Sequence, residues 1–164
     1  MKNSTIVYPT SANPPTWGHA DIMMRAAKKF DRLLWVVGVN PHKPASPFST
    51  EDKKQMLQAY VDYYQLKNVE IHHYAGAVAN FAQEQKAQFL LRGLRNTTDF
   101  QMELEMAAGN RGIQKNLETI CLFSKPHFAT ISSSLVRELA MLGEKIDQYV
   151  LPELVPLIQK KLQS

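Results

Sequence analysis

Two short segments, far apart in the sequence, carry residue types that could hold a polyphosphate. Thr16-Trp17-Gly18-His19 follows a short apolar run near the N-terminus, and Ile131-Ser132-Ser133-Ser134 follows another near the C-terminus. Each segment opens a helical pattern, so each is predicted to lie where a strand gives way to a helix. The first N–H groups of a helix have no partner within the helix, and the helix dipole favours negative charge there. An imidazole at one junction and three hydroxyls at the other therefore predict one polyphosphate held from two sides, which favours nucleotidyl transfer.

Apolar periodicity predicts the elements that position these two junctions. The predicted strands cover residues 5–8, 33–39, 69–74, 89–91 and 119–123. The predicted helices cover residues 20–30, about 50–64, 78–85, 97–110 and 132–142, and a last helix has Pro152 as its first residue. Strict alternation of strands and helices implies an α/β fold with a doubly wound, five-stranded parallel sheet of Rossmann-like type and helices on both faces.

The remaining candidate residues also fall after predicted strands, at the carboxyl ends where such sheets bind ligands. Lys43 follows the second predicted strand, and Arg92 to Arg95 follow the fourth. The sequence has no G-x-x-x-x-G-K-[ST] loop and no G-x-G-x-x-G turn. The lack of both motifs disfavours a P-loop kinase and a dinucleotide-dependent dehydrogenase.

Composition limits the class of protein. The 164 residues, 45% of them apolar, suffice for one well-buried core, and a single domain over residues 1–164 is expected. The net charge of +4 suits an anionic ligand, but the basic residues are scattered, so no nucleic-acid partner is predicted. The single Cys121 and the lack of a leader or a membrane-length apolar run predict a cytoplasmic protein without membrane contact. No trusted metal-ligand spacing relates the other histidines, His42, His72, His73 and His127.

Further motifs are distributed over nearly the whole chain. Besides the two junctions they are Asn40-Pro41-His42-Lys43, Ala79-Asn80-Phe81-Ala82, Leu91-Arg92-Gly93-Leu94-Arg95, Asp99-Phe100, Glu103 and Asn110-Arg111. With these motifs the chain resembles the bacterial phosphopantetheine adenylyltransferases, which are α/β nucleotidyltransferases with an (H/T)-x-G-H motif. The R-G-L-R run followed by D-F and E, together with I-S-S-S-L-V, is specific, whereas T-x-G-H alone marks only the superfamily.

The resemblance implies a reaction and a set of site residues. The reaction is transfer of the adenylyl group of ATP to 4′-phosphopantetheine, which gives dephospho-coenzyme A and pyrophosphate in coenzyme A biosynthesis. The resemblance makes His19 the catalytic donor to the α-phosphate. It implies ATP binding by Ser11, His19, Gly93, Leu94, Arg95, Glu103, Phe128, Ser132, Ser133 and Ser134. It implies acceptor binding by Ser11, Lys43, Val78, Arg92, Asn110 and Glu138. It also implies a homohexamer. Mg²⁺ is expected because it neutralises the polyphosphate, although the sequence shows no dedicated carboxylate cage for it.

The first loop departs from the family pattern Y-P-G-T-F-D-P. Here it reads Tyr8-Pro9-Thr10-Ser11-Ala12-Asn13-Pro14-Pro15. Thr10 replaces a glycine, and its β-branched side chain is expected to tolerate positive φ badly. Asn13 replaces an acid, and Asn-Pro-Pro-Thr resembles the loop of the nicotinate and nicotinamide mononucleotide adenylyltransferases. A mononucleotide acceptor, or a nucleotide-binding protein with impaired catalysis, is therefore the alternative; Arg92, Asn110 and Glu138 favour phosphopantetheine.

A purely structural role is the other interpretation of the same residues. Three serines before an apolar helix also form an N-cap. Arg92 and Arg95 could simply pair with acids of the next helix, since Arg95 and Asp99 have i,i+4 spacing. Independent structural features would not be expected to align at one edge of the sheet in the order of the family, which favours the functional interpretation.

Overall fold

The apolar runs form one parallel β-sheet. The computed structural model describes residues 4–39 and 45–163 of the chain. Its strands are β1 (Thr5–Thr10), β2 (Arg32–Val39), β3 (Val69–Ala75), β4 (Phe89–Leu94) and β5 (Glu118–Phe123). They lie in the order β3-β2-β1-β4-β5, so the chain reverses its direction of travel across the sheet between β1 and β4. Such a reversal is where a doubly wound sheet opens a crevice for a ligand.

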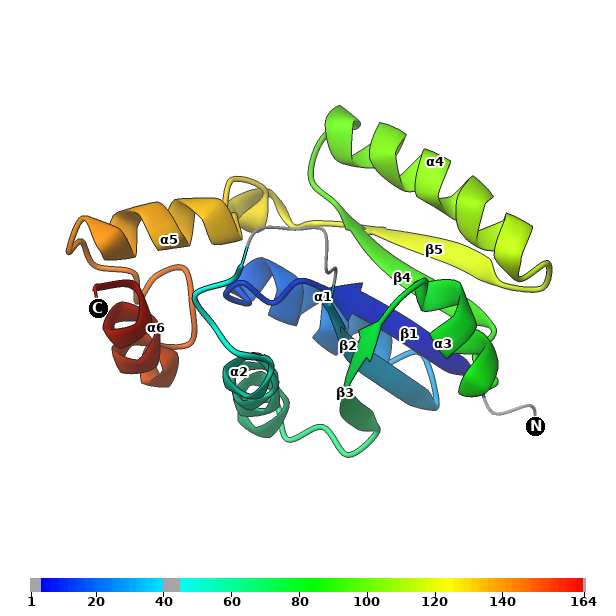
Figure 1. Cartoon of the computed structure of the whole chain (residues 1–164), viewed down its shortest axis with the longest axis horizontal. Helices are drawn as coiled ribbons and strands as arrows, with labels where there is room; N and C mark the ends of the chain where they lie inside the picture. The colour runs from blue at the N-terminus through cyan, green and yellow to red at the C-terminus, as the bar shows by residue number, and fades with distance from the viewer. Residues whose placement is uncertain (1–3, 40–44, 164) are drawn as a thin grey trace.

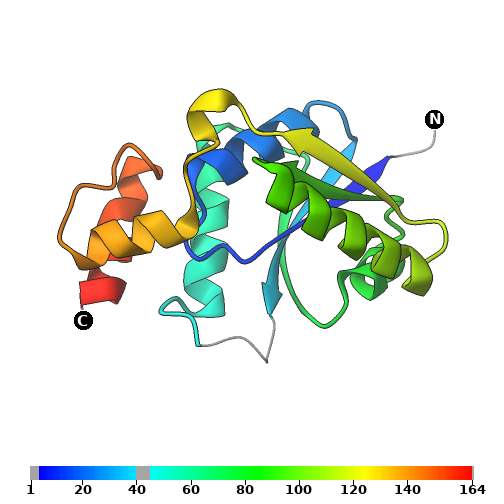
Figure 2. The same ribbon diagram turned by 90° about the horizontal axis from the view of Figure 1, so that it is seen from above.

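Helices cover both faces of the sheet (Figures 1 and 2). They are α1 (Trp17–Ala27), α2 (Thr50–Tyr63), α3 (Val78–Glu84), α4 (Thr97–Ile113), α5 (Ser133–Met141) and α6 (Val155–Gln163), with 3₁₀ turns η1 (Pro126–Phe128) and η2 (Pro152–Leu154). Side chains of α1, α2, α5 and α6 share the larger core with Ile6 and Tyr8 of β1, whereas α3 packs with Val7 on the opposite face. The doubly wound α/β fold predicted from the sequence is confirmed.

Strand β1 extends beyond its predicted end at Tyr8. Pro9 and Thr10 continue the pairing with β2, opposite Val36 and Val37. The pairing between β1 and β4 ends at Val7, so Pro9 has one strand neighbour, and a residue without an N–H is tolerated there. The sheet consequently separates between the ends of β1 and β4.

Strand β4 also extends further than predicted. Arg92, Gly93 and Leu94 pair with residues 121–123 of β5, so they lie within the strand and only Arg95 follows it. The prediction that all four residues follow the strand was wrong because a parallel neighbour can extend a strand past its apolar run.

The bounds of three helices differ from the predicted ones by three residues. α1 begins at Trp17 and ends at Ala27, each three residues before the predicted position, and α4 continues to Ile113. Pro152 begins the turn η2 rather than the last helix, which starts at Val155. Gly143, with φ +79°, follows the C-cap of α5, where glycine adopts this backbone conformation without strain. No helix within residues 4–39 and 45–163 combines the length and apolar character needed to cross a membrane.

Candidate active site

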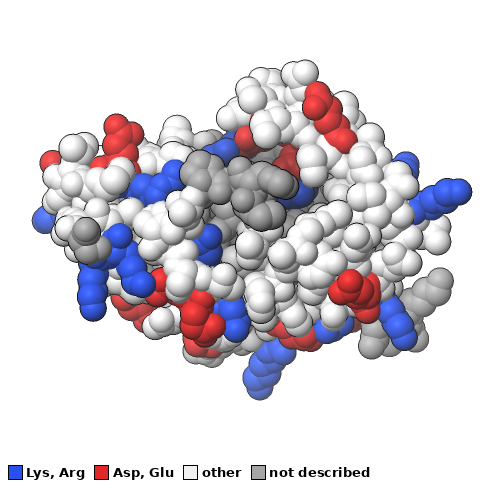
Figure 3. Space-filling model, in the orientation of Figure 1, with Lys and Arg blue, Asp and Glu red and all other residues white. Residues whose placement is uncertain are grey.

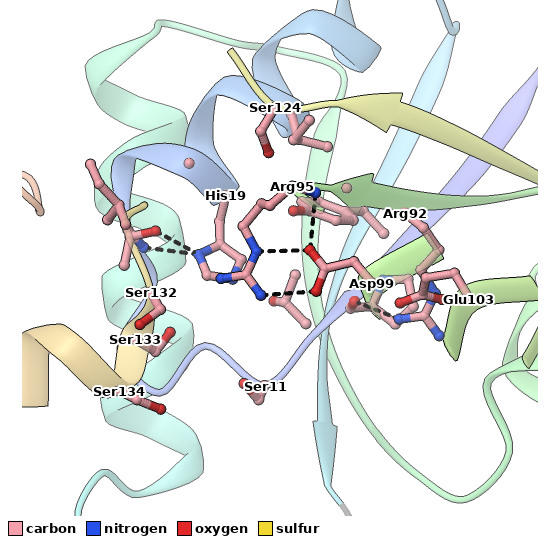
Figure 4. A pocket seen from close by; sticks show the side chains of 18 residues that line it. Ser11, His19, Arg92, Arg95, Asp99, Glu103, Ser124, Ser132, Ser133 and Ser134 are labelled. Atoms are coloured by element: carbon pink, nitrogen blue, oxygen red, sulfur yellow. Dashed lines mark hydrogen bonds and ion pairs between the residues drawn. The ribbon is translucent and has the colours of Figure 1, made fainter. Parts of the chain in front are cut away.

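A cavity of about 400 Å³ opens at the carboxyl ends of β1 and β4, where the strand order reverses. Figure 3 shows this face hollowed beside α4, with basic and acidic side chains lying together inside the hollow. Nine of the predicted site residues line the cavity: Ser11, His19, Arg92, Gly93, Arg95, Glu103, Ser132, Ser133 and Ser134 (Figure 4). The two junctions identified in the sequence therefore meet at one site.

His19 lies in the first turn of α1, where its ring takes the place of the acid in a capping box. Nδ1 of His19 accepts a hydrogen bond from the backbone N–H of Thr16 at 3.1 Å and lies 2.9 Å from the Thr16 hydroxyl. Because a backbone N–H can only donate, Nδ1 carries no proton, and the neutral ring is protonated at Nε2. Burial, and secondly the charge of Arg95, lower the pKa of His19 to about 4. At neutral pH the ring is therefore uncharged and has one N–H donor, at Nε2.

The protonation state of His19 gives a first prediction. Its pKa of about 4 lies below the ordinary 6.5, so the unfolded chain binds more protons between these pH values. The stability that a neutral His19 provides is complete above about pH 6.5 and is lost as the pH falls through about 4. In an NMR titration, the His19 ring signals, assigned by their absence in His19→Ala, should stay constant from pH 8 to pH 6. A titration midpoint between pH 6 and pH 7 would contradict the neutral ring.

All three hydroxyls of the serine junction make hydrogen bonds within the fold, and that of Ser134 accepts from Arg137 Nη2 at 3.3 Å. Ser132 is the N-cap of α5, and its Oγ accepts a hydrogen bond from the N–H of Leu135 at 3.1 Å. Ser133 Oγ donates to the carbonyl of Pro14 at 2.7 Å. Within the described part of the chain, the backbone N–H groups of Ser133 and Ser134 have no hydrogen-bond partner. The predicted N-cap and the predicted anion-binding N–H groups therefore coexist at the start of α5.

Substitutions of Ser132 should separate these two roles. Ser132→Ala removes the cap and should cost about 1 kcal/mol in the free energy of unfolding, measured with urea. Ser132→Asp keeps a capping oxygen but adds negative charge at the proposed polyphosphate site. We therefore expect Ser132→Asp to keep near-native stability and to bind ATP more weakly than Ser132→Ala. Equal ATP affinities for the two variants would leave Ser132 with a structural role alone.

The two cavity arginines are paired with acids of α4 (Figure 4). Arg95 donates to both carboxylate oxygens of Asp99, from Nε at 2.9 Å and from Nη2 at 3.1 Å. Arg92 Nε lies 3.0 Å from Oε2 of Glu103, and Arg92 Nη1 donates to the carbonyl of Pro9 at 3.5 Å. Burial raises the pKa of Glu103, although Arg92 opposes the shift. The ion pairs considered from the sequence exist, and their four charges sum to zero.

The first loop, which departs from the family pattern between Thr10 and Asn13, fits the site without conflict. Thr10 lies in β1 without positive φ, and its Oγ1 accepts a hydrogen bond from Trp35 Nε1 at 3.1 Å. The expected conflict at Thr10 was therefore wrong: the residue with positive φ is Ala12, at φ 47°, whose small side chain is buried. Asn13 accepts a hydrogen bond from the Ser46 hydroxyl at 2.8 Å through Oδ1.

Contacts from outside the cavity hold the two junctions together. Asp21 of α1, almost fully buried, lies 2.8 Å from Lys125 Nζ, next to the cavity residue Ser124. Arg25 Nη1 contacts the same carboxylate at 3.1 Å and donates to the carbonyl of Phe123 at 2.8 Å. On the other side, Arg137 of α5 donates to the carbonyl of Asn13.

These contacts were missed from the sequence. A carboxylate inside the apolar pattern of α1 was a signal for Asp21, and Arg137, one turn after Ser133, was a signal on α5. Thr16 was recognised only as part of a motif, although its N–H fixes the orientation of the His19 ring.

The other predicted site residues lie outside the cavity lining. Phe128 of η1 lies against Gly18, and Leu94 is buried at the end of β4. Val78, the first residue of α3, packs against the smaller apolar core on that face of the sheet. Asn110 is the one buried residue of α4, whereas Glu138 is exposed on α5. Lys43 lies outside the described residues.

Gly93 lies in close contact with α1. A Cβ at this position would approach Ile22 Cγ1 to 3.2 Å, so glycine allows α1 to lie close to β4. Ile22 also lines the cavity, and a side chain at Gly93 would push against the wall that carries His19.

Within residues 4–39 and 45–163, no group of three or more His, Cys, Asp or Glu side chains is arranged to hold a metal ion. Asp99 and Glu103 of the cavity contact arginines instead.

Comparisons with known proteins identify the family of this chain and solved structures with a similar fold. A model of the cytidylyltransferase-like family matches residues 7–139. A phosphopantetheine adenylyltransferase of Thermotoga neapolitana is 36% identical over 158 residues, which are 96% of each chain. One of Clostridium perfringens is 34% identical over 96% of this chain and 94% of its own. Among solved structures, a putative nicotinate-nucleotide adenylyltransferase of Vibrio parahaemolyticus superposes with a TM-score of 0.70 at 16% identity, covering 99% of this chain and 97% of that one. The similarity to the Vibrio structure concerns the fold alone.

Proposed function

This chain belongs to the cytidylyltransferase-like family and, within it, to the phosphopantetheine adenylyltransferases, and on that premise we propose that it transfers the adenylyl group of ATP to 4′-phosphopantetheine. The products are dephospho-coenzyme A and pyrophosphate. The observation that carries the proposal is a neutral imidazole with its Nε2 donor at the cavity where the serine junction and two arginines meet.

The reaction needs positioning and charge stabilisation rather than covalent help from the protein. A phosphate oxygen of the acceptor forms a bond to the α-phosphorus, and the bond from that phosphorus to the bridging oxygen breaks in line. Pyrophosphate leaves with the electron pair. Nε2–H of His19 donates to an oxygen of the α-phosphate as negative charge spreads over it, and a neutral donor performs this without a proton transfer.

Some of the residues around His19 are assigned to the triphosphate of ATP, and others to the phosphate of the acceptor. The free N–H groups of Ser133 and Ser134 at the start of α5 suit the β- and γ-phosphates. Arg95, which lies beside His19, is proposed to bind the polyphosphate, and Arg92 is proposed to bind the attacking phosphate of the acceptor. Lys43 is assigned to the acceptor phosphate by family resemblance.

Mg²⁺ is proposed to enter with the nucleotide. The cavity carboxylates contact arginines, so the described residues do not fit a protein-built magnesium site. Mg²⁺ prefers phosphate oxygens and water in such sites, and it would neutralise charge on the triphosphate when bound.

Pyrophosphate release tests the proposed function. The chain is incubated with Mg-ATP and phosphopantetheine, nicotinate mononucleotide or no acceptor. We expect release that depends on phosphopantetheine. Release only with nicotinate mononucleotide would favour the alternative acceptor suggested by Asn13-Pro14-Pro15-Thr16, and ATP binding without release for any acceptor would overturn the enzymatic function.

A homohexamer in the cytoplasm is also proposed, from the family resemblance and the single cysteine. Helix α4 supports self-association, because it exposes the large apolar side chains of Phe100, Met102, Leu104, Met106 and Ile113. We expect Leu104→Lys to reduce the molar mass measured by light scattering, and Leu142→Lys, at the exposed C-cap of α5, to leave it unchanged. A monomeric native chain would contradict the hexamer.

A further inference from the structure

Asp99 holds Arg95 by three contacts at once. Its Oδ2 accepts hydrogen bonds from the backbone N–H of Arg95 at 3.0 Å and from Nε at 2.9 Å, and its Oδ1 accepts from Nη2 at 3.1 Å. The side chain of Asp99 is 19% exposed, whereas that of Arg95 is 37% exposed. A planar guanidinium gripped along one edge loses its freedom to rotate, so Asp99 fixes both the position and the plane of Arg95.

The three contacts with Asp99 do not involve Nη1 of Arg95, which lies on the part of the guanidinium beside His19. Within residues 4–39 and 45–163, Nη1 of Arg95 has no hydrogen-bond partner. Figure 4 shows the Arg95 side chain between His19 and Asp99, and its charge acts on the His19 ring. The free donors of Arg95 and the Nε2 donor of His19 therefore belong to the same region of the cavity.

We propose that Asp99 is a positioning residue for the nucleotide, which fixes Arg95 so that its Nη1 donors face the polyphosphate beside His19. The proposal rests on the proposed function for the identity of the nucleotide. It assigns Asp99 an effect that opposes simple electrostatics, because a carboxylate in the cavity repels a polyphosphate. Loss of Asp99 removes that repulsion but also releases Arg95.

Two simpler accounts of Asp99 give different results. If its charge only repels ATP, Asp99→Asn should tighten ATP binding. If Asp99 serves only the first turn of α4, Asn96→Ala should have the same effect as Asp99→Ala, because Asn96 caps that helix by accepting from the N–H of Asp99 at 2.8 Å. Asn96→Ala leaves the side-chain contacts between Asp99 and Arg95 in place and is the matched control.

A double-mutant cycle tests the proposal. ATP binding is measured by calorimetry without acceptor for the native chain, Asp99→Ala, Arg95→Ala and the double variant. We expect Asp99→Ala to weaken ATP binding roughly tenfold, and to have no effect beyond about twofold once Arg95 is alanine. Asp99→Asn, which keeps the size and one acceptor oxygen, should show a smaller loss.

Tighter binding by either Asp99 variant, an equal loss in the Arg95→Ala background, or the same loss in Asn96→Ala would overturn the proposal. Because the titration contains no acceptor, its result does not depend on which acceptor the chain uses. Absence of pyrophosphate release with phosphopantetheine, alongside the expected cycle, would reject the proposed function and leave the role of Asp99 standing.

Discussion

Replacement of His19 by alanine is expected to reduce turnover by about 10²–10³-fold while ATP affinity changes by less than about threefold. The ring is held by Thr16 before any ligand binds, so its donor is preorganised, and it is uncharged at neutral pH. A neutral donor contributes little to ATP in the ground state and most when charge develops on the α-phosphate. Steady-state kinetics for pyrophosphate release and calorimetric ATP binding measure the two quantities separately.

Two further variants control for indirect effects of the change at His19. His73→Ala removes an exposed imidazole from β3, away from the cavity lining, and should leave both quantities unchanged. His19→Gln keeps a neutral N–H donor and should recover part of the lost turnover. Parallel losses of turnover and ATP affinity in His19→Ala would argue against a role confined to the transition state.

Local patterns explain why the two junctions could be predicted. Thr16 to His19 and Ile131 to Ser134 each combine a capping residue with the start of an apolar helix, although the preceding strands end earlier, at Thr10 and Phe123. The unbroken apolar run of β2 is typical of a strand buried on both faces, and its alternate side chains enter both cores. Strand order then brings the junctions together, because parallel strands present their carboxyl ends at one edge.

Side-chain pairing across the site depended on contacts that local patterns do not encode. The spacing of Arg95 and Asp99 allowed their ion pair, but the pairing of Arg92 with Glu103 required β4 to continue along β5. The contact between Asp21 and Lys125 joins distant parts of the chain, and its geometry follows only from the packed fold. Positive φ at Ala12 rather than Thr10 likewise depends on where β1 leaves the sheet.

Replacement of Arg92 by alanine is expected to raise the KM for phosphopantetheine roughly 10²-fold. The expected loss is that of the charged contact between Arg92 and the acceptor phosphate, and truncating one member of such a pair at an interface costs about 2–5 kcal/mol. The KM for ATP should change much less, since Arg95 and the serine junction remain. Arg92→Lys keeps the charge but not the two-pronged donor geometry, so it should recover only part of the acceptor binding. Initial rates at varied acceptor concentration, with ATP saturating, measure this effect.

Arg92→Ala should also change the pKa of Glu103 and, through it, the pH dependence of stability. Burial raises the pKa of Glu103 and Arg92 opposes that shift, so removal of Arg92 should raise the pKa further. A raised folded-state pKa makes the folded chain bind protons that the unfolded chain has released, so this contribution favours folding at low pH and declines as the pH rises. Arg92→Ala should therefore lose more stability at pH 8 than at pH 5.5 in urea unfolding, whereas Arg92→Lys should show a smaller difference. An unchanged KM for phosphopantetheine together with a raised KM for ATP would instead assign Arg92 to the nucleotide and leave the acceptor phosphate to other residues.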